Sequence, residues 1–187
     1  MLVTAFFCGV KAQSKFGIKA GTNIPDLAGD DVSSDIKNKI GFYAGGFVTI
    51  PVSENFTVQP ELLWSNKGYK YNELGEFTTT FNYIHIPVLI QYHAKGFYAE
   101  TGPQIGILIT AKQKIESGPN ESIKDSFKST AFSWGAGIGY QLPSGFGIGV
   151  RYNIGLGSIS EESSIDAKFN VLMLGIFKSF GGKGKSK

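Results

Sequence analysis

The chain has 187 residues and a formal net charge of +3, which suits a single domain and gives no support for nucleic-acid binding. No internal apolar run approaches the roughly 20 residues of a membrane-spanning helix. The mean hydropathy of -0.02 resembles that of a soluble protein, but the alternating strands of a membrane β-barrel average to the same value. The 25 glycines and the 13% of aromatic residues favour an all-β architecture.

Residues 1–12, MLVTAFFCGVKA, form a short apolar run with small residues at the spacing of a signal-peptidase site. We expect a signal peptide that is cleaved between Ala12 and Gln13, although a buried first strand is the alternative. The only cysteine, Cys8, lies inside this run, so the mature chain has neither a disulfide nor a cysteine metal site. The predicted barrel then spans residues 13–180, and residues 181–187 form a polar basic tail.

Turn signals divide the barrel region into eight segments in which apolar and polar residues alternate, as they do in strands with two different faces. The segments are residues 16–22, 39–51, 55–68, 81–93, 96–110, 129–142, 145–157 and 167–180. Short turns follow the second, fourth and sixth segments, and long polar loops follow the others. This pattern predicts an eight-stranded antiparallel up-and-down transmembrane β-barrel with both ends on the periplasmic side. Soluble up-and-down barrels share the meander.

The composition of the two faces separates these alternatives. In residues 145–157, large apolar residues occupy one face, whereas glycine, Arg151 and Asn153 occupy the other. Residues 129–142 likewise place glycine, Ser133 and Gln141 opposite large apolar residues. A water-facing strand usually carries more charge than this, and small residues suit a narrow lumen filled by bulky partners. We therefore assign the apolar face to lipid and the glycine-rich polar face to the interior.

Aromatic residues gather near the ends of the segments, where amphipathic rings suit the two membrane interfaces. An ordinary aromatic core is the alternative. The residues that we assign to the aromatic belts are Trp64, Tyr92, Phe132, Tyr140 and Phe180.

Charged and titratable residues also occur on the interior face, namely Lys19, Glu61, His85, Glu100 and Arg151. An unpaired charge in a narrow lumen is costly, so we expect these residues to form one charge network. In an eight-stranded barrel, the segments that carry Glu61 and Arg151 lie opposite each other, and both residues sit about six positions from the short-turn end. The sequence therefore predicts that Glu61 and Arg151 meet across the lumen, either as a permanent brace, which we favour, or as a gate.

Three mid-segment prolines, Pro60, Pro87 and Pro103, lack a hydrogen-bond donor, and we expect bulges beside them. The only histidines, His85 and His93, lie on one segment roughly 26 Å apart, too far for a joint metal site. We expect no catalytic residue, no metal and no cofactor, so the chain is not expected to be an enzyme.

Several stretches resemble the PorT-like outer-membrane β-barrel family of Bacteroidetes. They are FGIKAGTN, GFYAGGFVTIPVSENFTVQPELLWSNKGYK, YIHIPVLIQY, YAETGPQIGIL and RYNIGLGSI. The resemblance covers nearly all of residues 16–180. It implies a barrel in the bacterial cell outer membrane that is surrounded by lipid and inserted by the barrel-assembly machinery. It also implies a link to protein secretion through the founding member of the family.

Three functions remain open from the sequence. The first is a structural or interaction barrel whose long extracellular loops meet a surface or secretion partner. The second is a narrow channel for small solutes that is gated near Glu61 and Arg151. The third is a soluble barrel that binds an apolar ligand.

Overall fold

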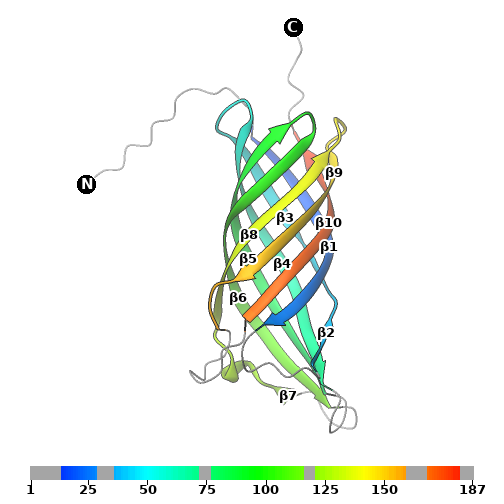
Figure 1. Cartoon of the computed structure of the whole chain (residues 1–187), viewed down its shortest axis with the longest axis vertical. Helices are drawn as coiled ribbons and strands as arrows, with labels where there is room; N and C mark the ends of the chain where they lie inside the picture. Colours follow the sequence, from blue (N-terminus) through cyan, green and yellow to red (C-terminus); the bar gives the residue numbers. More distant parts are fainter. Residues whose placement is uncertain (1–13, 29–35, 72–76, 116–120, 159–167, 182–187) are drawn as a thin grey trace, which may run out of the picture.

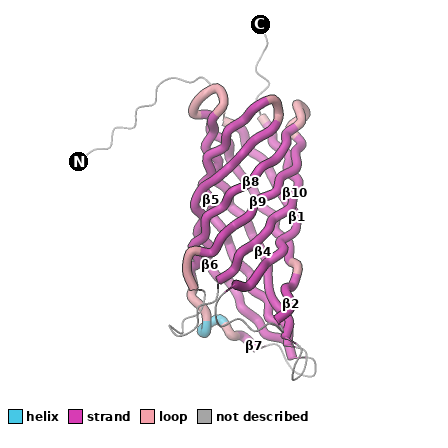
Figure 2. Tube along the Cα trace, viewed as in Figure 1, coloured by secondary structure: helices cyan, strands magenta, loops and turns pink. Residues whose placement is uncertain are grey.

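The computed structural model describes residues 14–28, 36–71, 77–115, 121–158 and 168–181. The predicted signal peptide therefore lies outside the described residues. Figure 1 shows a long barrel of tilted strands. Figure 2 marks one short helical turn, η1 (Lys124–Ser126), at the end of the barrel that carries the long loops. In the described part of the chain, no helix is long and apolar enough to cross a membrane.

Eight long antiparallel strands form the wall of the barrel. They are β1 (Lys15–Ala28), β3 (Gly41–Pro51), β4 (Phe56–Tyr71), β5 (Phe77–Ala94), β6 (Phe97–Ile115), β8 (Thr130–Gln141), β9 (Phe146–Gly155) and β10 (Lys168–Phe180). Each pairs with the next along the chain, and β10 pairs back with β1, which closes the ring. The prediction of an eight-stranded antiparallel barrel is confirmed, and each predicted segment corresponds to one strand of the wall.

Two additional strands extend one side of the barrel at its long-loop end. The short strand β2 (Ile36–Lys39) pairs with β4, and β7 (Glu121–Ser122) pairs with β6. Strands β4, β5 and β6 are longer than the sequence predicted. At this end they continue beyond the neighbouring strands of the wall (Figure 1). We call this part, which runs in the order β2, β4, β5, β6 and β7, the extension sheet.

The outer surface of the barrel is apolar over most of its height. On β8 and β9, Ile138 is 67% exposed, Ile148 is 62% exposed and Val150 is 43% exposed. On the opposite face of β9, Gly147 and Arg151 are buried and Gly149 is half-buried. An apolar surface this extensive requires a lipid cover. The assignment of the apolar face to the outside and of the glycine-rich face to the lumen is correct.

The prolines do not produce the expected bulges. Beside each of Pro60, Pro87 and Pro103, one ladder skips two pairs and then resumes in the same register. A proline nitrogen has no hydrogen to donate, so a local gap in pairing is sufficient and no extra residue is needed. A register shift lies instead between Asn82 and Tyr83, where the two faces of β6 exchange parity.

We expect the protein to show the heat-dependent gel mobility of a closed barrel. Detergent-extracted protein should migrate faster without boiling than after boiling, because the ring of paired strands stays compact until heat opens it. A soluble protein without this shift would contradict the lipid-facing assignment of Ile138 and Ile148. Comparison of boiled and unboiled samples on one gel provides the measurement.

Candidate functional site

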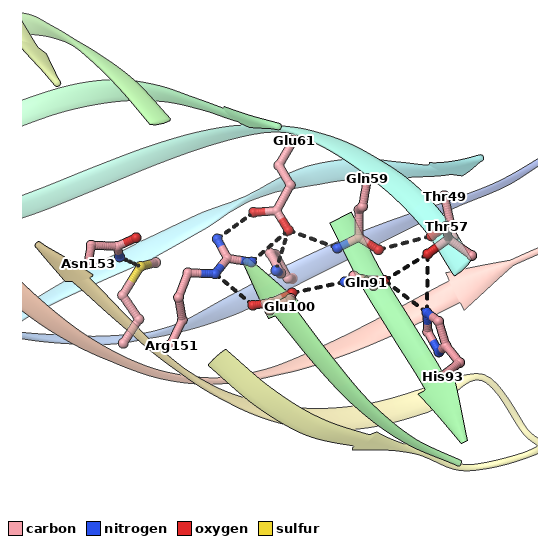
Figure 3. A network of polar contacts seen from close by, with 11 residues as sticks. Thr49, Thr57, Gln59, Glu61, Gln91, His93, Glu100, Arg151 and Asn153 are labelled. Carbon is pink, nitrogen blue, oxygen red and sulfur yellow. Dashed lines mark hydrogen bonds and ion pairs between the residues drawn. The ribbon is translucent and has the colours of Figure 1, made fainter. Parts of the chain in front are cut away.

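A charge network crosses the middle of the lumen and joins opposite walls of the barrel (Figure 3). Glu61 on β4 and Arg151 on β9 form a two-pronged ion pair: Nη1 donates to Oε2 and Nη2 donates to Oε1, each at 2.9 Å. Lys19 on β1 donates from Nζ to Oε1 of Glu61 at 2.6 Å. The Glu61 side chain is completely buried. Paired guanidinium and carboxylate groups form the strongest hydrogen bonds among side chains.

Glu100 on β6 completes the network. It accepts a hydrogen bond from Nε of Arg151 at 2.7 Å, so that one guanidinium contacts both carboxylates. Two cations, Lys19 and Arg151, thereby face two anions, Glu61 and Glu100. Such balance is needed because each isolated charge would lose its hydration on burial without compensation. The structure thus brings together four of the five charged and titratable residues selected from the sequence.

Two glutamine side chains extend the network toward the short-turn end. Gln59 donates from Nε2 to Oε1 of Glu61 at 2.8 Å, and Gln91 donates from Nε2 to Oε2 of Glu100 at 2.9 Å. Beyond Gln91, the Nε2 atom of His93 lies 3.1 Å from Oε1 of Gln91. The sequence reasoning missed both glutamines. Because Gln59 is two positions before Glu61, it had to share the interior face with it.

His85 does not join the charge network, which corrects that part of the prediction. It pairs across the ladder with Gly106 and lies one interior position closer to the long-loop end than Glu61 does. The Nε2 atom of Gln104 lies 3.1 Å from Nδ1 of His85, and the imidazole stacks on Tyr83 with ring centroids 5.3 Å apart. Among the described residues, no group of three or more His, Cys, Asp or Glu side chains is placed to hold a metal ion.

Aromatic side chains fill the lumen on both sides of the charge network. Toward the short-turn end, Phe177 packs edge-on against Phe47 and Tyr98, with both centroid distances at 5.9 Å. Toward the long-loop end lies a buried cluster of nine residues: Tyr43, Leu63, Phe81, Tyr83, Leu108, Ala111, Phe169, Val171 and Met173. The interior is therefore a packed core, as in other eight-stranded barrels.

Lys67 is buried in this aromatic layer, separate from the charge network. Its Nζ lies 4.7 Å from the ring centroid of Tyr83 and 4.5 Å from that of Phe169. In the part of the chain that the structure describes, no ion pair of Lys67 is found. It borders a cavity of about 30 Å³, enough for a water molecule. Three lining residues have side-chain oxygens without a hydrogen-bond partner: Asn23, Gln104 and Asn153.

We expect Lys67→Met to stabilise the barrel by about 1 kcal/mol, because burying an ammonium without a carboxylate costs more than cation–π contact returns. The measurement is the urea midpoint in detergent or lipid. Lys70→Met on the exposed face of the same strand serves as the control and should change stability little. Destabilisation by Lys67→Met would show that cavity water and the aromatic rings solvate the ammonium adequately.

The residues assigned to the aromatic belts face outward. Trp64 is 43% exposed, Tyr92 is 44% exposed and Phe180 is 38% exposed. Phe132 is also exposed, and Tyr140 packs edge-on against Phe97 at 4.7 Å. Their function at the membrane interfaces remains a prediction.

A family model described as the outer membrane protein beta-barrel domain matches residues 11–161, most of the chain. The chain belongs to this family. Membership agrees with the closed ring and with the apolar outer surface, and it indicates the bacterial outer membrane as the location of the protein. The alternative of a soluble barrel that binds an apolar ligand is therefore set aside.

Solved structures of outer-membrane proteins share the fold. Ail, the attachment invasion locus protein of Yersinia pestis, solved in complex with the heparin analogue sucrose octasulfate, is 21% identical with a TM-score of 0.55. The alignment covers 90% of this chain and 99% of Ail. Neisserial surface protein A is 12% identical with a TM-score of 0.58, over 90% of this chain and 99% of that protein. No curated protein sequence matches the chain.

Proposed function

We propose that the protein is a non-conducting, non-enzymatic outer-membrane barrel that acts as an interaction scaffold, with the charge network as a permanent brace. The observation that carries this proposal is the packing of the lumen. Glu61, Arg151 and Glu100 block its middle, and aromatic side chains fill it on both sides. A solute would have to displace both layers.

The geometry of the charge network favours a brace over a gate. Arg151 donates three hydrogen bonds to carboxylates on two different strands, and Lys19 adds a fourth from a third strand. Opening would separate these buried charges, and the aromatic layers on both sides of the network offer no other group of opposite charge. A gate normally has a second arrangement of comparable free energy, and the fully paired network offers no evident one.

Conductance across a planar lipid bilayer tests this proposal. The reconstituted wild-type barrel should show no steady channel openings, because packed side chains occupy the lumen. Arg151→Ala should also stay closed, since the aromatic layers on both sides of the network persist. Conductance that appears in wild-type protein, or that rises in Arg151→Ala, would instead support the narrow gated channel. Lys128→Ala, at an exposed position outside the wall, is the control for reconstitution.

The long-loop end is where we place the interaction with a surface or secretion partner. In the extension sheet, β4, β5 and β6 continue beyond the apolar surface at that end. Outer-membrane barrels place their longer loops outside the cell. The resemblance to the PorT-like family supports a secretion-related partner and insertion by the barrel-assembly machinery. In vivo crosslinking from position 121 on β7, compared with position 95 in a short turn, tests this: partner crosslinks specific to position 121 are expected.

A further inference from the structure

Among the side chains that the structure describes, the outer face of the extension sheet carries four lysines in two adjacent rows. The first row crosses the strands as Lys39, Gly68, Thr80 and Lys112. By backbone pairing, the second row runs Lys37, Lys70, Thr78 and Lys114. The register shift beside Tyr83 creates this arrangement, because it turns the even-numbered residues at the end of β6 to the outside. Without it, Lys112 and Lys114 would face the lumen side.

The lysine rows form one compact patch. Lys112 and Lys114 are two positions apart on one strand, roughly 7 Å, and Lys114 is separated from Lys70 by one strand, roughly 10 Å. Lys39 reaches across Gly68, which has no side chain, and donates from Nζ to Oγ1 of Thr80 at 2.8 Å. This contact holds one ammonium over the middle of the patch. Lys70, Lys112 and Lys114 are exposed.

No negative charge lies on the same face of the patch among the side chains that the structure describes. The described outward positions of β4, β5, β6 and β7 within the extension sheet hold glycine, threonine, asparagine, serine and lysine. Glu121 pairs with Gln113 and therefore belongs to the opposite parity. Like charges on neighbouring strands repel one another, so a bound polyanion would stabilise this face.

The position of the patch selects the source of that anion. Trp64, Ile84 and Ile107 form the last complete apolar row on this side of the barrel, and only Ile109, which is 46% exposed, lies beyond it on β6. The first lysine row lies four positions further along β4, roughly 13 Å along a tilted strand and less along the membrane normal. Lipid headgroups occupy roughly 5 to 8 Å beyond the hydrocarbon core, and lysine side chains can bend several ångströms toward them.

We propose that Lys39, Lys70, Lys112 and Lys114 bind the phosphate groups of phosphorylated glycolipid in the outer leaflet around the barrel. The patch continues the lipid-facing wall directly, so the lipid that covers Trp64 and Ile84 presents its headgroup to the lysines. Lysine is a strong phosphate ligand as a point charge, and the threonine hydroxyls between the lysines add hydrogen-bond donors. This inference is independent of whether the lumen conducts.

Native mass spectrometry of detergent-solubilised protein, titrated with diphosphorylated lipid A, tests the proposal. The quadruple variant Lys39→Gln/Lys70→Gln/Lys112→Gln/Lys114→Gln should lose about 100-fold in lipid affinity, since each lysine near an anionic headgroup contributes several-fold. Lys112→Gln/Lys114→Gln should lose about 10-fold. Its matched control, Lys15→Gln/Lys95→Gln, removes the same charge at the short-turn end and should bind normally. Retention of the heat-dependent gel shift confirms that each variant is folded.

The choice of competing ligands distinguishes the possible sources of the anion. We expect lipid A without phosphates to bind the wild type as weakly as the quadruple variant binds the diphosphorylated form, and inorganic phosphate alone not to saturate. Equal loss of affinity in the matched control would overturn the proposal, because it would indicate net charge alone. Heparin binding that requires the four lysines, together with unchanged lipid A binding, would also overturn it and assign the patch to a soluble polyanion.

Discussion

Arg151→Met is expected to destabilise the barrel by about 3 to 5 kcal/mol, because it removes one partner of a buried ion pair and leaves the other without compensation. In this protein the substitution affects two carboxylates. Among the described residues, Glu61 would keep its contacts with Lys19 and Gln59, whereas Glu100 would keep its contact with Gln91 alone. Methionine preserves much of the side-chain length, so the loss measures charge more than volume. Urea unfolding in lipid vesicles, followed by tryptophan fluorescence, gives the free energy of unfolding.

A second substitution separates loss of charge balance from loss of packing. Arg151→Met/Glu100→Gln removes one cation and one anion, and the remaining pair of Lys19 and Glu61 at 2.6 Å is intact. We expect the double variant to be more stable than Arg151→Met alone, despite the additional substitution. If the double variant were less stable, Arg151 would act mainly by filling the lumen. Lys128→Met, which removes an exposed cation, should leave the free energy of unfolding unchanged within about 0.5 kcal/mol.

The wall of the barrel could be predicted from the sequence because alternation has a strict period of two. Once Arg151 and Gly147 were assigned to one face, every second residue of β9 followed. Opposite placement of β4 and β9 followed from the strand number, which is why the contact between Glu61 and Arg151 could be anticipated. Local patterns and one global number, eight strands, were sufficient for this part of the site.

Other features depend on three-dimensional details that alternation does not carry. His85 shares the interior face with Glu61, but it lies one interior position away along the barrel. Its short side chain contacts Gln104 instead of the charge network. The register shift beside Tyr83 has no proline or glycine at its position, so no local sequence signal marks it. Without that shift the lysines at the end of β6 could not be placed. Burial of Lys67 likewise depends on Phe169, a residue from the last strand.

Gly147→Ala is expected to destabilise the barrel by about 1 to 3 kcal/mol through overpacking. A Cβ at position 147 would overlap the ring of Phe177, and its three nearest atoms all belong to that ring. The conflict is therefore between two side-chain positions. A smaller side chain opposite the new methyl group should relieve it. Phe177→Leu alone should also destabilise, because it leaves space beside Gly147.

The double variant Gly147→Ala/Phe177→Leu should be more stable than the sum of the two single effects predicts, with a coupling of about 1 kcal/mol or more. Equilibrium unfolding of all four proteins completes the cycle. Additivity within about 0.5 kcal/mol would mean that β9 moves away from Phe177 instead, and that the lumen is looser than its packing indicates.

Gly21→Ala provides the contrasting case and should cost more than Gly147→Ala, about 3 kcal/mol or above. Here the added Cβ would meet the backbone oxygen of Leu174 on the paired strand, and only then the ring of Tyr43 at 2.8 Å. The backbone of β10 cannot move away from position 21 without breaking the pairing of β1 with β10, and this pairing closes the barrel. Tyr43→Leu should therefore fail to rescue Gly21→Ala.

Rescue in both pairs would show that aromatic rings alone set the glycine positions. Rescue at Gly147 only would show that some lumen glycines make room for rings, whereas Gly21 is required for closure of the barrel itself.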